Sequence, residues 1–90
     1  MSTDEPTPLA IAMRYEAPRP PVVTASGRGA AAESILELAE THGIPLHDDP
    51  ELAGLLAKVP LGEEIPTALY TAVAEVIAFV YLMAGRIDSA

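Results

Sequence analysis

An almost uninterrupted apolar run between Pro66 and Ala84 constrains the fold of this chain more than any other feature. Ala and Leu favour a helix, and no Gly or Pro interrupts the run after Pro66, which suits a first helical turn because its missing N–H costs nothing there. Gly85 is predicted to end this helix, with Arg86 close to its negative C-terminal end. A helix this apolar must be buried on most sides or lie in a membrane.

Length and one charge disfavour the membrane alternative. A spanning helix needs about 20 apolar residues, so this run is marginal, and Glu75 would lie near the bilayer centre at a cost of at least a few kcal/mol. We therefore predict a core helix around which a small domain is built. Two neighbouring stripes at helical spacing are its predicted apolar faces, Leu69, Val73, Val76 and Val80 beside Tyr70, Ala74, Ile77 and Tyr81, while Thr71, Glu75 and Ala78 are predicted to face water.

Composition indicates one small domain and excludes several kinds of partner. The chain has 90 residues, half of them hydrophobic, and no cysteine, so no disulfide or thiolate metal site supports it. Its net charge of −8, from 13 acidic and 5 basic residues, opposes binding to nucleic acid or to an anionic membrane, because phosphate contacts need Lys and Arg. The start M-S-T-D-E-P lacks the regions of a secretory signal, which predicts a cytoplasmic protein.

Two strands are predicted in the first third of the chain, after a polar, extended or disordered lead over residues 1–8. Residues 9–15 alternate large and small side chains with period two, which favours a strand, although Ala and Met would also permit a short helix. The stiff connection E-A-P-R-P-P at 16–21 leads to a second short strand at 22–25. We expect residues 9–85 to form the domain, with residues 86–90 as a tail.

The glycines of S-G-R-G are predicted to break the chain before a helix over residues 30–42. A phosphate-binding loop is the alternative, but S-G-R-G lacks both the G-K-[ST] ending and the G-x-G-x-x-G pattern. His42 and Gly43 mark the end of this helix. Its predicted packing residues are Ile35, Leu36, Leu38 and Ala39, and its predicted outer residues are Glu33, Glu37 and Glu40.

A third short strand is predicted at residues 44–47, followed by a helix from Pro50 to about Lys58. Asp49 is positioned to cap that helix, and Pro50 suits its first position. Leu52, Leu55 and Leu56 are predicted to point inward. The resulting order of strand, strand, helix, strand, helix, helix indicates a compact α/β fold.

No catalytic constellation is evident in the sequence. His42, His47, Asp48 and Asp49 are the only cluster rich in candidate ligands, which makes a small metal- or ligand-binding enzyme the alternative function. A helix-end His and a capping Asp explain the same residues. Serines and threonines lack an evident His partner, so we predict a binding domain with no catalytic residue, no cofactor and no metal.

The segment E-P-T-P-L-A-I-A-M-R-Y at 5–15 resembles the N-P-T-H-Y-A-V-A-L-K-Y segment of the FlhB/YscU family, the export-gate proteins of flagellar and virulence type III secretion systems. The pattern I-P-x-x-L-Y-x-A-V-A-E-V at 65–76 is the most specific part of this resemblance, which covers residues 5–83. Further matching segments are P-P-V-V-T-A-S-G-R-G at 20–29, A-E-S-I-L-E-L-A-E-T-H-G-I-P at 32–45, D-P-E-L-A-G-L-L at 49–56 and L-G-E-E-I-P at 61–66.

The resemblance implies a cytoplasmic substrate-switch domain with an α/β fold, in which three to four helices surround a small mixed sheet of about three to four strands. In the family this domain follows a four-helix membrane domain, which we do not expect in this chain, and it cleaves itself between Asn and Pro of N-P-T-H. Here Glu5 and Pro8 replace Asn and His, while Pro6 and Thr7 remain. A carboxylate lacks the attacking amide nitrogen, so we expect no autocleavage; the chain looks like a freestanding, already-cut fragment.

Family resemblance also implies a small apolar pocket for export substrates, which maps by position onto Pro20, Pro21, Ala74 and Ile77. The expected partners are therefore export substrates, the membrane component of the export gate and other proteins of the export apparatus. We expect a monomer without a membrane span of its own, acting in flagellar or other type III export and influencing substrate specificity. One sheet edge is expected to be open, because few residues precede Glu5.

Overall fold

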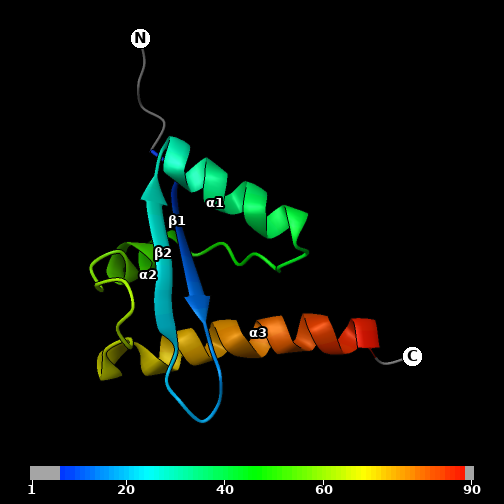
Figure 1. Cartoon of the computed structure of the whole chain (residues 1–90). Helices are drawn as coiled ribbons and strands as arrows, with labels where there is room; N and C mark the ends of the chain where they lie inside the picture. Colours follow the sequence, from blue (N-terminus) through cyan, green and yellow to red (C-terminus); the bar gives the residue numbers. More distant parts are fainter. Residues whose placement is uncertain (1–6, 89–90) are drawn as a thin grey trace.

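Two antiparallel strands and three α-helices make up residues 7–88, the part of the chain that the computed structural model describes; side chains are described for residues 7–83. Figure 1 shows α1 and α3 toward opposite ends of the hairpin, with the loop end of the hairpin crossing α3. The elements are β1 (Leu9–Arg14), β2 (Val22–Arg28), α1 (Ala30–Thr41), α2 (Pro50–Leu56), the 3-10 turn η1 (Thr67–Leu69) and α3 (Tyr70–Asp88).

The hairpin of β1 and β2 confirms the period-two prediction for the first strand. Its register pairs Leu9 with Arg28 at one end and Arg14 with Val22 at the other, with an irregularity after Ala12. The Thr24 hydroxyl donates a hydrogen bond of 3.2 Å to the carbonyl oxygen of Ala12 near this irregularity. The sheet is thus antiparallel and two-stranded, with fewer strands than the three to four predicted, and the outer edge of β1 pairs with no other strand within residues 7–88.

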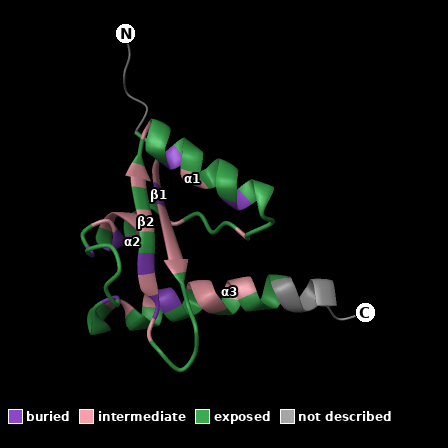
Figure 2. Ribbon diagram, in the orientation of Figure 1, coloured by how far each residue is buried: buried purple, intermediate pink, exposed green. Residues whose placement is uncertain are grey.

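The core lies where β2, α2 and α3 meet (Figure 2). Val23 and Val73, which are 0% and 1% exposed, are its most deeply buried side chains. Ile11 and Met13 of β1 pack against this cluster, which places the large residues of the first strand on the face turned to α2 and α3. The buried members of the cluster are Val23, Leu52, Leu56, Val59, Ile65 and Val73.

Small residues form the other face of the hairpin, against which α1 packs. Ala10 and Gly27 are direct cross-strand partners and therefore point to the same face. A Cβ atom on Gly27 would come within 2.7 Å of Ala31 Cβ, so α1 approaches the backbone of β2 closely. The buried residues of α1 are Ala32 and Ala39. The helix can approach this closely because the residues on both contacting surfaces, that of the hairpin and that of α1, are small.

This packing corrects the prediction for leucines of the two shorter helices. Leu36 and Leu38 of α1 were expected in the core but are 39% and 59% exposed, and Leu55 of α2 is 45% exposed. Alanines occupy the contact face of α1 because the opposing sheet surface is shallow, so the leucines beside them reach the solvent. Leu52 and Leu56 of α2 are buried as predicted.

The S-G-R-G segment also differs from its prediction. Gly27 and Arg28 belong to β2, which runs beyond the predicted end at residue 25, and only Gly29 breaks the chain before α1. Gly29 has a φ of 60°, and its N–H donates a hydrogen bond of 2.9 Å to the carbonyl oxygen of Pro8. Gly27 therefore allows α1 to pack closely, and Gly29 forms the turn before it. These are structural roles, as expected if the segment is not a phosphate-binding loop.

No strand forms at residues 44–47, where the third strand was predicted. Ile44 and Leu46 alternate correctly, but both are exposed, and Pro45 between them cannot donate to a ladder. A different segment lies beside β2 instead, through an isolated bridge between Val22 and Glu64. Backbone hydrogen bonds join the two segments, from Gly62 N–H to the oxygen of Val23 at 2.8 Å and from Ile65 N–H to the oxygen of Pro21 at 3.1 Å.

The apolar run forms the predicted helix but does not end at Gly85: α3 continues to Asp88. A glycine inside a helix costs only about 1 kcal/mol relative to alanine, which is too little to end a long helix by itself. Thr71 and Glu75 are exposed as predicted. Within the described residues, no helix has the length and apolar character required to cross a membrane.

The close approach of α1 to β2 predicts opposite effects for two Gly→Ala substitutions. Gly27→Ala should destabilise the domain by about 1–3 kcal/mol, because the new methyl group would overlap Ala31 Cβ and lie 2.9 Å from its carbonyl carbon. Gly54→Ala, in α2 with open space around the new methyl group, should stabilise it by up to about 1 kcal/mol. Urea unfolding measures both, and a Gly27→Ala variant as stable as the parent would contradict the close packing.

Candidate functional site

A pocket of about 440 Å³ lies where the hairpin loop crosses one face of α3. Its helical wall repeats at positions 70, 73, 74, 77, 78 and 81, the spacing of one face of an α-helix. Ile65 and Val73, which are nearly fully buried, join it to the core. The lining residues are Tyr15, Pro18, Arg19, Pro20, Pro21, Ile65, Tyr70, Val73, Ala74, Ile77, Ala78 and Tyr81.

Backbone contacts fix the loop side of the pocket. Arg19 N–H donates a hydrogen bond of 3.0 Å to the oxygen of Glu16, which closes the turn of the hairpin. At the other end, Ile65 N–H donates to the oxygen of Pro21, which holds residue 65 against the start of β2. Prolines between these two points have fixed φ angles, so this wall loses little conformational entropy when it forms.

All four residues that family resemblance assigned to a substrate pocket line this one cavity. Pro20 and Pro21 come from the hairpin loop, and Ala74 and Ile77 from α3. Pro21 is buried and Pro20 partly so, whereas Ala74 is exposed. The structure thus brings the four residues together from segments some 50 positions apart in the chain. Their role in binding a substrate stays a prediction.

Sequence reasoning missed the aromatic character of the pocket. The three tyrosines of the chain, Tyr15, Tyr70 and Tyr81, all line it, and each is exposed. The rings of Tyr15 and Tyr81 lie 6.3 Å apart between centroids, which bridges the end of β1 and the middle of α3. Two of these tyrosines occur in the second apolar stripe of the helix, but nothing in the local sequence links Tyr15 to them.

The chemistry of this lining suits recognition of an apolar group. Arg19 is its only charged side chain, and the other residues are aliphatic, proline or tyrosine. Tyrosine offers a large apolar face with one polar atom, a combination common where proteins bind other proteins. The lining contains no carboxylate, His, Cys, Ser or Lys, and its tyrosines are the only side chains in it of a type that enzymes use as acids, bases or nucleophiles.

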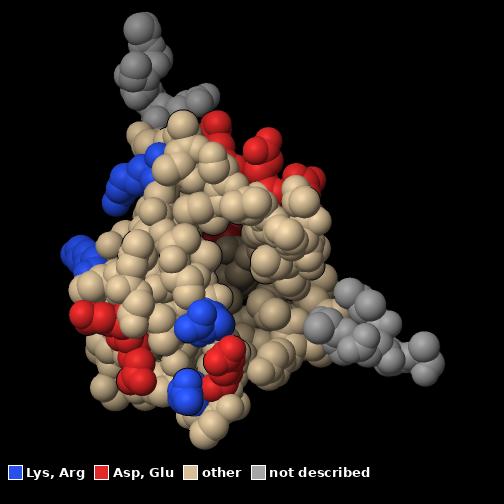
Figure 3. Space-filling view, viewed as in Figure 1, with Lys and Arg blue, Asp and Glu red and all other residues tan. Residues whose placement is uncertain are grey.

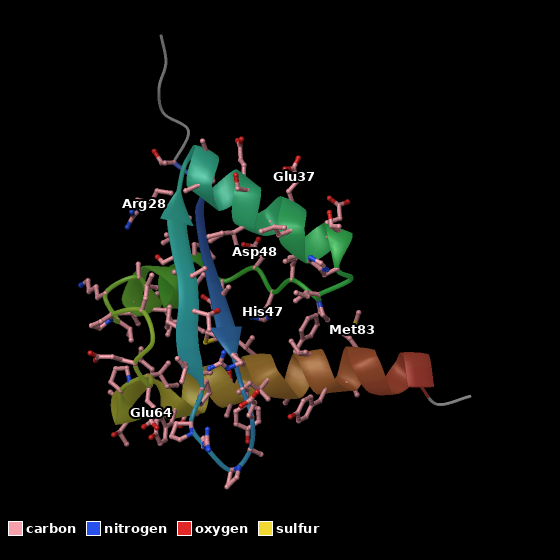
Figure 4. All side chains as sticks on the ribbon, in the orientation of Figure 1. Arg28, Glu37, His47, Asp48, Glu64 and Met83 are labelled. Carbon is pink, nitrogen blue, oxygen red and sulfur yellow. The ribbon has the colours of Figure 1, made fainter. Side chains whose placement is uncertain are left out.

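Two side chains of the histidine and aspartate cluster of the alternative enzyme prediction, those of Asp49 and His47, make other contacts. Asp49 accepts a hydrogen bond of 3.1 Å from Leu52 N–H and caps α2, while His42 is the C-cap residue of α1 and donates its backbone N–H to the oxygen of Leu38. His47 packs on Phe79 with ring centroids 5.3 Å apart, and it lies with Asp48 between α1 and α3 (Figure 4). Among the described residues, no group of three or more His, Cys, Asp or Glu side chains is placed to hold a metal ion.

Comparison with known proteins identifies the family. The model of the FlhB HrpN YscU SpaS Family matches residues 4–80, most of the chain. The chain belongs to the FlhB/YscU family.

Curated relatives extend this finding. The chain is 47% identical over 78 residues to the flagellar biosynthetic protein FlhB of Aquifex aeolicus, an alignment that covers 83% of this chain and 22% of that protein. It is 36% identical over 81 residues to the uncharacterized protein YlqH of Bacillus subtilis, with 86% of this chain and 87% of that protein covered. The chain therefore spans about a fifth of the length of the FlhB relatives that it matches.

Solved structures confirm the FlhB/YscU-type fold. A mutated EscU C-terminal domain superposes with a TM-score of 0.78 at 32% identity, covering 83% of this chain and 94% of that one. The PscU C-terminal domain gives a TM-score of 0.77 at 34% identity, with 82% and 98% covered. The α/β architecture predicted from the sequence is thus confirmed, apart from the number of strands.

The degenerate family motif lies only partly within the described residues. Glu5 and Pro6, which flank the bond that family members cleave, fall outside them. Thr7 and Pro8 are described and exposed. The carbonyl oxygen of Pro8 accepts the hydrogen bond from Gly29 N–H, which attaches the last residue of the motif to the turn between β2 and α1.

The capping role of Asp49 predicts a change in stability that a metal site would not produce. Asp49→Ala should destabilise the domain by about 1 kcal/mol, because Leu52 N–H loses its acceptor, whereas Asp49→Asn should retain most of the cap. Asp48→Ala, at an exposed neighbour, should be nearly neutral. Thermal unfolding with zinc and with a chelator provides the comparison; zinc stabilisation that both alanine variants abolish would favour the metal site instead.

Proposed function

We propose that this chain is a protein-binding domain that acts in the cytoplasm as part of a type III export apparatus. We take that apparatus to be the flagellar one. Through the pocket between the hairpin loop and α3 it binds export substrates or components of the export gate and so influences substrate specificity. Family membership supports the export context, because several of the similar proteins are named flagellar biosynthetic protein FlhB. The apolar pocket on α3 supports the proposal that the domain acts by binding other proteins.

The convergence of Pro20, Pro21, Ala74 and Ile77 on one apolar cavity is the observation that carries this proposal. Exposed tyrosines beside a buried apolar floor resemble the pockets in which single anchor side chains of a partner are buried. A volume of about 440 Å³ lies within the usual range of ligand pockets. Such a site would take one or two apolar side chains of an export substrate without chemical change.

Ala74→Asp should abolish or strongly weaken binding of export substrates while leaving the fold intact. Ala74 is exposed when the pocket is empty, so water can solvate the new carboxylate. A bound apolar side chain would exclude that water and leave the charge unpaired, which should weaken binding at least about tenfold. Calorimetry with purified export substrates and gate components from the same organism measures this change.

A matched variant controls for the added charge. Ala68→Asp places the same side chain at an exposed position of η1, outside the pocket lining, and should bind like the parent. Circular dichroism and thermal unfolding of both variants establish that they are folded. Equal binding by parent and Ala74→Asp would exclude this pocket, and absence of binding by the parent to every candidate would contradict the proposed function.

We further propose that this chain does not cleave itself. In the family reaction the Asn amide nitrogen attacks its own backbone carbonyl carbon, the bond to proline breaks, the proline nitrogen leaves as an amine, and a succinimide remains. Glu5 supplies no amide nitrogen at that position.

Mass spectrometry should therefore find the bond between Glu5 and Pro6 intact in the purified protein. The double variant Glu5→Asn, Pro8→His should gain cleavage there, since it restores the family motif N-P-T-H. Glu5→Asp, Pro8→His is the control, because its carboxylate has nearly the same shape as asparagine but no amide nitrogen. Loss of residues 1–5 from the parent would overturn this proposal.

A further inference from the structure

A second groove, of about 630 Å³, runs between α1 and the segment that follows it. It shares no residue with the pocket on α3. Its lining residues are Glu33, Leu36, Glu37, Glu40, Gly43, Ile44 and Leu46. We refer to it as the α1 groove.

The floor of the α1 groove consists of apolar side chains that the fold leaves in water. Leu36, Ile44 and Leu46 are 39%, 55% and 54% exposed, and none of them belongs to the core cluster. Scattered exposed leucines need no explanation, but these three line one cavity. Covering them would remove apolar surface from water at no cost to the core.

Backbone hydrogen bonds hold this floor in place without a partner. Gly43 has a φ of 67° and turns the chain back along α1. Ile44 N–H then donates a hydrogen bond of 2.8 Å to the oxygen of Ala39, and Gly43 N–H one of 3.2 Å to the oxygen of Glu40. The end of α1 is thereby satisfied, and residue 44 is fixed against the helix. The groove is therefore formed before anything binds to it.

Carboxylates at helical spacing form the wall. Glu33, Glu37 and Glu40 follow one another at four and three residues, so they lie on one side of α1. Like charges at this spacing destabilise a helix, and the only ion pair among the described side chains joins Arg14 to Glu16 elsewhere. Acidic atoms gather over α1 in Figure 3 with no basic atoms among them, and Glu37 projects away from α3 in Figure 4.

We propose that the α1 groove binds a cationic amphipathic helix of another protein. Leucine-like side chains on one face of that helix cover Leu36, Ile44 and Leu46, and Lys or Arg beside them meet the three glutamates. Charge complementarity carries this choice of partner, because an apolar floor beside a purely acidic wall attracts apolar segments flanked by cations and repels those flanked by anions. The ligand is distinct from that of the pocket on α3.

Other occupants fit less well. Nucleic acid and anionic membranes present the same charge as the wall. A second copy of this chain carries 13 acidic and 5 basic residues and would also be repelled. An extended cationic peptide would meet the same charges at a similar spacing, because alternate side chains of a strand lie about 7 Å apart, so the comparison with a scrambled peptide below separates it from a helix.

Fluorescence anisotropy with a labelled synthetic peptide of about 18 residues tests the proposal. The peptide carries Leu along one helical face and Lys on both flanks; a scrambled peptide of the same composition lacks the amphipathic face. The amphipathic peptide should bind at least about tenfold more tightly, more weakly as salt rises, and should shift the amide NMR signals of Leu36 and Ile44. Equal binding of both peptides would overturn the proposal.

Two triple variants separate a local site from general attraction to an acidic protein. Glu33→Gln, Glu37→Gln, Glu40→Gln should weaken binding about tenfold, whereas Glu63→Gln, Glu64→Gln, Glu75→Gln removes the same charge from exposed positions outside the groove and should change binding less than about twofold. Glu64 is labelled far from Glu37 in Figure 4. Equal weakening by both triple variants would overturn the proposal.

Ile44→Ser tests the apolar floor. It should weaken peptide binding without lowering the thermal unfolding temperature, because residue 44 is outside the core. Loss of peptide binding on Ala74→Asp would assign the peptide to the pocket on α3 and contradict the proposal. Self-association of the protein that Ile44→Ser abolishes would contradict it as well, in favour of a second copy of the chain.

Discussion

Contact between the start of β2 and the first turns of α3 is the interaction on which the rest of this structure depends. Val23 and Val73 are its centre, both excluded from water, and burial of a valine of this kind contributes about 1.5–3 kcal/mol. A two-stranded hairpin is at best marginally stable alone, so its faces must be covered. Helix α3 covers one of them, and the segment ending at Ile65 is held beside β2 by backbone hydrogen bonds.

The pocket on α3 follows from how that contact is built. A helix that is apolar on two neighbouring stripes buries one of them and only Ile77 of the other against a narrow hairpin. Leu69, Val73 and Val76 pack toward the core, whereas Tyr70 and Tyr81 of the second stripe remain exposed. The hairpin loop then projects across this second stripe and supplies the opposite wall. Incomplete burial of the central helix is thus the physical origin of the site.

Periodicity in the sequence predicted the elements that depend on local pattern. The apolar stripe of α3 and the alternation of β1 were both evident, because a buried face imposes a fixed spacing on each. Which segments distant in the sequence lie side by side was harder to predict. The alternating residues 44–47 carry the pattern of a strand, but a strand also needs a neighbour with free hydrogen-bonding groups, and the segment beside β2 comes from residues 62–65. Only tertiary structure brings Tyr15 to Tyr81.

The prediction of buried leucines was wrong for α1, because the sheet surface that this helix contacts is unusually flat. Leucines are normally the packing residues of an amphipathic helix, yet α1 contacts the sheet through Ala32 and Ala39. Gly27 explains this, because a side chain there would overlap α1 and larger residues on the helix would hold it away. Leu36 is displaced to the flank beside the glutamates as a result. The exposed apolar floor of the α1 groove is therefore a consequence of the small residues beneath α1.

The two concave surfaces differ in charge, although both arise from incompletely covered apolar helices. Arg19 is the only charged residue around the pocket on α3, and three glutamates are the only charged residues around the α1 groove. An apolar anchor flanked by acidic residues would be repelled by the glutamates of the groove, and one flanked by basic residues would be attracted by them, whereas the pocket presents no such wall. Because specificity is a difference between affinities, this separation of charge would let the two proposed sites select different partners.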